Sequence, residues 1–141
     1  MATHIALGML GLAGFFISLY FTLVYYGILQ PDWGFIPRVC RMDKQTCGSL
    51  IHTREARLLG LPNSVFGIGF YLFVIVTSVC FSGESYAISL QILFWASIIA
   101  VAMGIYLTYS LMVKLRTKCV LCFASHTINL LILLILYFSL A

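Results

Sequence analysis

Residues 86–113 read YAISLQILFWASIIAVAMGIYLTYSLMV, and none of these side chains carries a charge. As an α-helix, a run of this length would be about 40 Å long, which exceeds the roughly 30 Å hydrocarbon core of a bilayer. A soluble helix of that length presents a polar face to water, and this one has none. The run therefore predicts a membrane-spanning helix.

Three further apolar runs cover about residues 5–29, 61–81 and 119–140. Their apolar residues do not alternate with polar ones, which disfavours transmembrane strands, since strands must alternate and close into a barrel. The first run has no basic segment before it and no small-residue cleavage site after it, so we expect it to be retained rather than removed as a signal peptide. We predict an all-α integral membrane protein, one domain over residues 1–141, with four spanning helices.

The composition agrees with this class, because 62% of the 141 residues are hydrophobic and only 9% are charged. So few polar side chains cannot cover a soluble core, and a lipid bilayer is the expected environment. The net charge of +4 is attributed to an anionic lipid surface and not to nucleic acid, which is not an expected partner. An ion transporter is disfavoured, because Asp32, Asp43, Glu55 and Glu84 lie in or beside loops.

The connections between the runs are unequal: residues 30–60 form a long polar loop, 82–85 a tight turn and 114–118 a short basic loop. With four spans, the first and third connections share one membrane face. Within the first, residues 48–59 have mixed polarity and are expected to form a short amphipathic helix that acts as a lid. All eight Lys and Arg residues lie in these two loops, so the positive-inside rule places this face in the cytoplasm.

Four of the five cysteines fall on that same face. Cys40 and Cys47 lie in the long loop, whereas Cys119 and Cys122 form a C-x-x-C motif at the start of the fourth helix. Cys80 lies alone in the second run and is expected to pack as a small hydrophobe. Two dithiols on one face suggest a relay, because a thiolate that attacks a disulfide passes electrons from one pair to the next.

The C-x-x-C motif has a spacing and a position that favour redox chemistry. Residues three apart lie on one side of a helix, and the positive end of the helix dipole, together with Arg116 and Lys118, favours a thiolate. The motif could instead be a coincidence among packing cysteines, or the four cysteines could bind zinc. Zinc is disfavoured because six residues separate Cys40 from Cys47, where structural sites usually have two to four. A quinone is the natural lipid-dissolved acceptor of two electrons.

The second run opens with Pro62-Asn63-Ser64-Val65-Phe66-Gly67. With the loop cysteines before it and the C-x-x-C motif after it, the chain resembles the vitamin K epoxide reductase family over nearly its whole length. The resemblance implies a membrane thiol-disulfide oxidoreductase that supports disulfide formation. By the same resemblance, Cys40 exchanges with a thioredoxin-like partner, Cys47 passes electrons to Cys119, and Cys122 reduces the quinone.

The resemblance also implies a quinone-binding asparagine at the start of the second helix, and this falls on Asn63. A desolvated amide needs such a partner, although Asn63 or Ser64 could instead be a plain helix cap. Phe66, Phe70 and Tyr71 are candidates for the wall of an aromatic pocket, or for ordinary packing.

His126 follows Cys122 by one helical turn, where vertebrate members of that family carry a tyrosine. It could donate a hydrogen bond to the quinone or move a proton, or it could be a satisfied polar residue of the bundle. His4 and His52 have no comparable position.

Some bacterial relatives carry a fused thioredoxin-like domain. This chain ends at its fourth helix, so a separate partner is expected. Menaquinone, ubiquinone or a vitamin K type quinone is the expected acceptor, with reduction of the epoxide left open. The family usually places its cysteines on the extracytoplasmic side, which is opposite to the orientation that the charge bias predicts.

Overall fold

The computed structural model describes residues 2–30, 52–80, 83–114, 116 and 119–141. In this part of the chain, four helical segments are long and apolar enough to cross a membrane. They are α1 (Ala2–Tyr25), α2 (Asn63–Cys80), α3 (Gly83–Tyr109) with its continuation in the π-helix η3 (Ser110–Lys114), and α4 (Val120–Leu140). The prediction of an all-α membrane protein with four spanning helices is confirmed.

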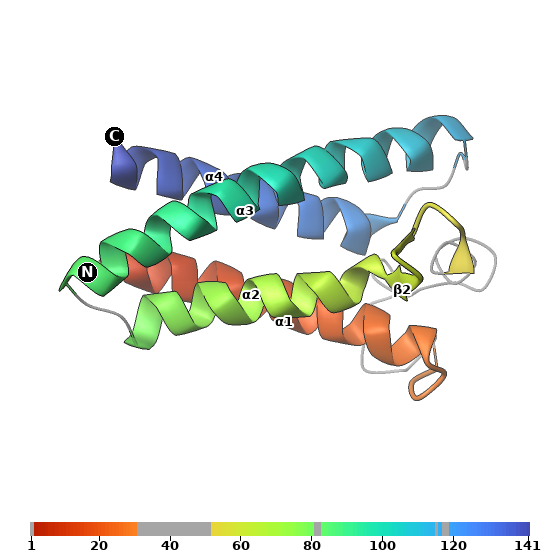
Figure 1. The fold of residues 1–141 in the computed structure, drawn as a ribbon. Coiled ribbons are helices and arrows are strands. Elements are labelled where there is room, and N and C mark those ends of the chain that lie inside the picture. Colours follow the sequence, from red (N-terminus) through yellow and green to blue (C-terminus); the bar gives the residue numbers. More distant parts are fainter. Residues whose placement is uncertain (1, 31–51, 81–82, 115, 117–118) are drawn as a thin grey trace.

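The helices form two pairs, α1 with α2 and α3 with α4, and the pairs meet mainly where α1 contacts α4. Figure 1 shows both chain termini at one end of the bundle, together with the end of α2 and the start of α3. The start of α4 and the segment that precedes α2 lie at the other end (Figure 1). The C-x-x-C motif is therefore held at the end of the bundle that carries the described part of the long first loop.

Small residues let α1 and α2 approach closely. Gly11 and Gly14 of α1 are buried and face Val74 and Tyr71 of α2. Without side chains on α1 at these positions, the larger α2 residues pack directly against its backbone, which is how many membrane helices associate. This contact belongs to the core of the bundle, whose buried members are Leu7, Tyr71, Val74, Leu90, Leu93, Ile132 and Leu136.

Gly14 gives a direct test of this packing. A Cβ atom at position 14 would lie 2.2 Å from Cε1 of Tyr71, a side chain that is only 1% exposed and has no room to move. We expect Gly14→Ala to destabilise the bundle by about 1–3 kcal/mol through overpacking. Gly69→Ala is the matched control, since a Cβ there meets nothing within 4 Å. Unfolding of both variants by titration with a denaturing detergent measures the difference, and equal stability would contradict the described contact.

The segment before α2 differs from the expected lid helix over 48–59. Residues 53–62 form turns and a hairpin of two short strands, β1 (Arg57–Leu58) and β2 (Leu61–Pro62), whereas residues 48–51 lie outside the described residues. The reason is the turn itself: Leu59 and Gly60 have φ angles of 54° and 84°. Two successive left-handed residues make a tight hairpin turn and end any helix, and glycine adopts that conformation without steric cost.

Two side-chain contacts tie this hairpin segment to the bundle. The Arg57 guanidinium lies over the Tyr25 ring at the end of α1, 5.6 Å from its centroid. Glu55 forms an ion pair with Lys114 at the end of η3, with 3.7 Å between Oε1 and Nζ. The ion pair is partly exposed and is worth little by itself. Together the two contacts link the segment to the first and third helices.

Two helix ends also differ from the sequence-based expectation. The first helix ends at Tyr25 although its apolar run continues to residue 29, and Gly27 beyond it adopts a φ of 71°. The second helix ends at Cys80, whose side chain is exposed. The expectation that Cys80 packs as a small hydrophobe is not met among the described residues, because its side chain is exposed at the last described residue of α2.

Candidate functional site

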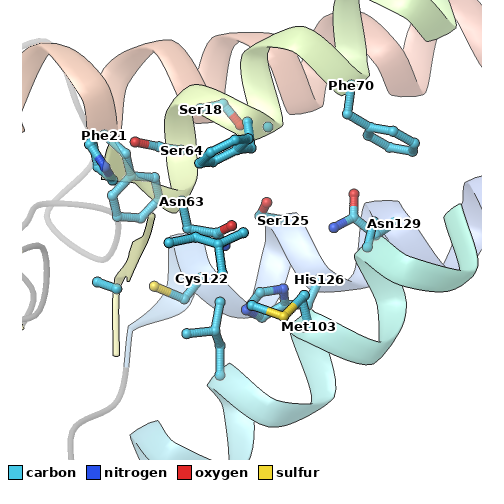
Figure 2. A pocket seen from close by; sticks show the side chains of 18 of the residues that line it. Ser18, Phe21, Asn63, Ser64, Phe70, Met103, Cys122, Ser125, His126 and Asn129 are labelled. Atoms are coloured by element: carbon cyan, nitrogen blue, oxygen red, sulfur yellow. The ribbon is translucent and has the colours of Figure 1, made fainter. Parts of the chain in front are cut away.

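A cavity of about 400 Å³ lies between the two helix pairs, and the C-x-x-C motif contributes to its wall. All four spanning helices and the hairpin segment line it (Figure 2). The lining includes Ser18 and Phe21 of α1, Asn63, Phe66, Phe70 and Tyr71 of α2, Met103, Gly104 and Ser110 of α3 and η3, and Cys122, Ser125, His126 and Asn129 of α4.

The two cysteines of the motif have different surroundings. Cys119 is the N-cap residue of α4, with an extended backbone (φ −116°, ψ 105°), and its side chain is fully buried among Val24 and Leu111. Cys122 lies in the first turn of α4, is partly buried, carries a free thiol and lines the cavity. Cys122 is thus the cysteine of the motif that a molecule in the cavity can reach.

Asn63 begins α2 and lines the same cavity as Cys122. Its backbone N–H donates to the Ala56 carbonyl oxygen over 2.8 Å, which fixes the start of the helix against the hairpin segment. Its side chain lines the cavity, on the wall opposite α4, which carries Cys122 (Figure 2). The neighbouring Ser64 hydroxyl is paired with Thr22 of α1 at 2.9 Å. The amide is therefore placed to donate to a molecule that also contacts Cys122.

His126 lines the cavity one turn further along α4. Its Nδ1 atom is buried and has no hydrogen-bond partner among the described residues. The imidazole lies against the backbone of α3 at Gly104, where an added Cβ would lie only 2.8 Å from Nδ1. A buried polar atom without a partner costs free energy, so a hydrogen-bonding molecule in the cavity would relieve that cost.

The aromatic candidates all belong to the cavity wall, but Tyr71 differs from the other two. Phe66 and Phe70 present apolar rings, whereas Tyr71 is almost fully buried and uses its hydroxyl for hydrogen bonds to α4. That hydroxyl donates to Oδ1 of Asn129 over 2.6 Å and lies 3.3 Å from Oγ of Ser125. Ser125 and Asn129 were not predicted from the sequence, although their spacing from Cys122 places them on one face of α4.

A family model described as the vitamin K epoxide reductase family matches residues 5–137, which is nearly the whole chain. The chain belongs to the vitamin K epoxide reductase family. It is therefore an oxidoreductase, and its four spanning helices make it an integral membrane protein.

The loop pair of this vitamin K epoxide reductase family member, Cys40 and Cys47, lies outside the described residues, as do residues 48–51 of the predicted lid. The alternative of a zinc site needs these two cysteines as ligands. Within the described ranges, no three His, Cys, Asp or Glu side chains gather to hold a metal ion. His52 stacks on Tyr25 at the cysteine end, and His4 stacks on Tyr86, so neither joins the cavity.

Proposed function

We propose that this vitamin K epoxide reductase family member oxidises thiols and passes their electrons to a quinone bound in the cavity. One observation carries the proposal: Cys122 and Asn63, from two different helices, line the same cavity between the spanning helices. A thiol can reduce a quinone ring, and an amide can donate to the ring oxygen. The resemblance stated above assigns the same two roles to these residues.

The cavity is compatible with a quinone headgroup. Its volume of about 400 Å³ lies within the range typical of small-molecule sites. Phe66 and Phe70 offer apolar surface to a flat ring, while Asn63 and His126 offer polar groups for its oxygens. A plain quinone of the menaquinone, ubiquinone or vitamin K type satisfies these features, and nothing in the cavity requires an epoxide.

The proposed reaction moves two electrons and two protons. The thiols of Cys119 and Cys122 are oxidised to a disulfide, and the quinone is reduced to a quinol. As the ring oxygen near Asn63 gains negative charge, the amide N–H stabilises it, which is the general role of a fixed donor in a site that excludes water. His126 is proposed to donate a hydrogen bond or a proton to the ring.

The dithiol of the motif is then regenerated by thiol-disulfide exchange. Cys47 is proposed to reduce the disulfide of the motif at Cys119, which leaves a disulfide between Cys40 and Cys47. A separate thioredoxin-like protein then reduces that disulfide at Cys40 and becomes oxidised itself. The net reaction turns the partner's dithiol into a disulfide and a quinone into a quinol, and so supports disulfide formation.

The membrane orientation has two opposed indications. The end of the bundle that carries the C-x-x-C motif also carries four basic residues, Arg54, Arg57, Lys114 and Arg116, and this charge favours a cytoplasmic position for that end. Disulfide formation, in contrast, is usual on the extracytoplasmic side. Labelling of the loop cysteines in intact cells with a membrane-impermeant thiol reagent decides between the two.

Asn63 provides the test of quinone binding. With purified protein and dithiothreitol as electron donor, we expect Asn63→Leu to lower kcat/KM for a quinone about 10- to 100-fold, because the donor to the charged oxygen is lost. Ser139→Ala is the control: Ser139 is a polar residue of α4 at the opposite end of the bundle, bonded to Ile135 of its own helix. An unchanged kcat/KM in the Asn63 variant would show that Asn63 does not bind the quinone. Absence of dithiol-dependent quinone reduction by the wild-type protein would refute the proposed function.

A further inference from the structure

A chain of hydrogen bonds crosses the deep part of the cavity wall, from α4 through Tyr71 of α2 and back to α4. The Tyr71 hydroxyl donates to Oδ1 of Asn129 over 2.6 Å. The same hydroxyl lies 3.3 Å from Oγ of Ser125, a distance at which it can accept a hydrogen bond from the serine. The tyrosine ring is fixed, because it is 1% exposed and packs against Gly14 of α1.

This arrangement determines which way the Asn129 amide points. A side-chain amide has one acceptor oxygen and one nitrogen with two donors. Since the oxygen of Asn129 accepts from Tyr71, the nitrogen is directed elsewhere. Figure 2 shows the Asn129 side chain at the cavity wall with its nitrogen turned to the side of Ser125 and Cys122. Two N–H donors are therefore presented to the cavity.

Asn129 lies deeper in the bundle than the residues assigned to the first quinone oxygen. It follows Cys122 by seven residues, which is about 10 Å along a helix, and it follows His126 by three, so these side chains share one face of α4. Helical side chains lean toward the N-terminal end of their helix, and this brings the Asn129 amide back toward Cys122. Asn63 and Asn129 thus lie at two levels of one cavity.

We propose that Asn129, oriented by Tyr71, is a second hydrogen-bond donor to the quinone. This inference rests on the proposed function. A 1,4-quinone carries its two oxygens on opposite sides of the ring, so when one oxygen binds Asn63 the other points away from it. That second oxygen has two lone pairs and would lie between Asn129 and His126. Asn129 binds the oxygen, and Tyr71 is a positioning residue that acts through Asn129.

A purely structural role for Asn129 would be to satisfy the buried Tyr71 hydroxyl, which needs a partner. Two features favour the binding role instead. Ser125 already offers Oγ at 3.3 Å and its backbone oxygen at 3.4 Å to that hydroxyl. In addition, an amide brings two N–H donors that Tyr71 does not use, and at a cavity wall these donors also need partners.

The test compares two ligands that differ in one oxygen: 1,4-naphthoquinone and the one-carbonyl analogue 1-tetralone. With dithiothreitol as electron donor, we expect Asn129→Leu to raise the KM for naphthoquinone about three- to tenfold, the usual effect of one lost hydrogen bond. The inhibition constant of 1-tetralone should change less than twofold, because its single carbonyl oxygen can bind Asn63 and it has no second oxygen to bind Asn129. Thr127→Val is the matched control on α4, since Thr127 is exposed and bonded within its own helix.

Tyr71→Phe is the second variant, and it retains the ring that packs against α1. It should raise the KM for naphthoquinone in the same direction but less, because the amide keeps its donors and loses only its orientation. Added to Asn129→Leu, it should have no further effect on this KM.

Three results would overturn the inference: an unchanged KM in Asn129→Leu, equal weakening of both ligands, or fully additive effects in the double variant. If Asn129→Leu does not fold, an unchanged naphthoquinone KM in Tyr71→Phe overturns it as well. None of these results affects the proposed function, which fails only if the wild-type protein does not reduce naphthoquinone.

Discussion

Replacement of Cys122 by alanine is expected to abolish quinone reduction, with a loss of at least about a thousandfold in rate. Cys122 is the cysteine of the motif that lines the cavity, whereas Cys119 is buried at the start of α4. Without the Cys122 thiol, electrons cannot pass to the ring, and the disulfide of the motif cannot form. The loss should be the same with a thioredoxin-like partner and with dithiothreitol, and spectroscopic detection of quinol formation measures it.

Cys80→Ala is the matched control for this experiment. Cys80 also carries a free thiol, but it lies at the end of α2 that is farthest from the motif. Its removal should leave both rates within about twofold of wild type. Wild-type rates in the Cys122 variant would mean that the cavity thiol is not the one that reduces the quinone, and the assignment of roles within the motif would be wrong.

The second large effect is expected for Cys47→Ala, and it should depend on the electron donor. Reduction driven by a thioredoxin-like partner should fall at least about a hundredfold, because the proposed relay from Cys40 to Cys119 is interrupted. Reduction driven by dithiothreitol should stay within a few-fold of wild type, since a small dithiol can reach the motif directly. Parallel assays with the two donors measure the difference.

A mixed disulfide that accumulates between the partner and Cys40 in the Cys47 variant would support the relay. Equal loss with both donors would contradict it, because a shuttle is bypassed by a small dithiol whereas a structural cysteine is not. The experiment thus tests whether the loop pair transfers electrons from the partner to the motif.

The fold followed from the sequence because the bilayer imposes a simple requirement. A run without charges, such as residues 86–113, has no stable alternative to a spanning helix. The segment before α2 was predicted less well, because mixed polarity over 48–59 fits a surface helix as well as a turn. The hairpin there depends on the backbone angles of Leu59 and Gly60, and a leucine in the left-handed region gives no signal in the sequence.

The candidate site, like the fold, was predicted only in part from the sequence. Cys122, Asn63 and His126 were named from motifs, and the fold brings all three to one cavity, while their roles stay proposals. Asn129 was missed because one asparagine in an apolar helix is not a motif. Its importance comes from the 2.6 Å contact with Tyr71, which lies 58 residues away in the sequence. Helical spacing from Cys122 was the one signal that could have found it.

The weak packing between α2 and α3 has a consequence for how the protein meets its substrate. The cavity lies between the two helix pairs, with Phe66 and Phe70 of α2 on one side and Ile99 and Met103 of α3 on the other, and these two helices contact each other least among the neighbouring pairs. A quinone would thus enter sideways from the bilayer, with its isoprenoid tail remaining in lipid. Turnover would then follow the mole fraction of quinone in the membrane, and adding quinone-free lipid at constant total quinone would slow the enzyme.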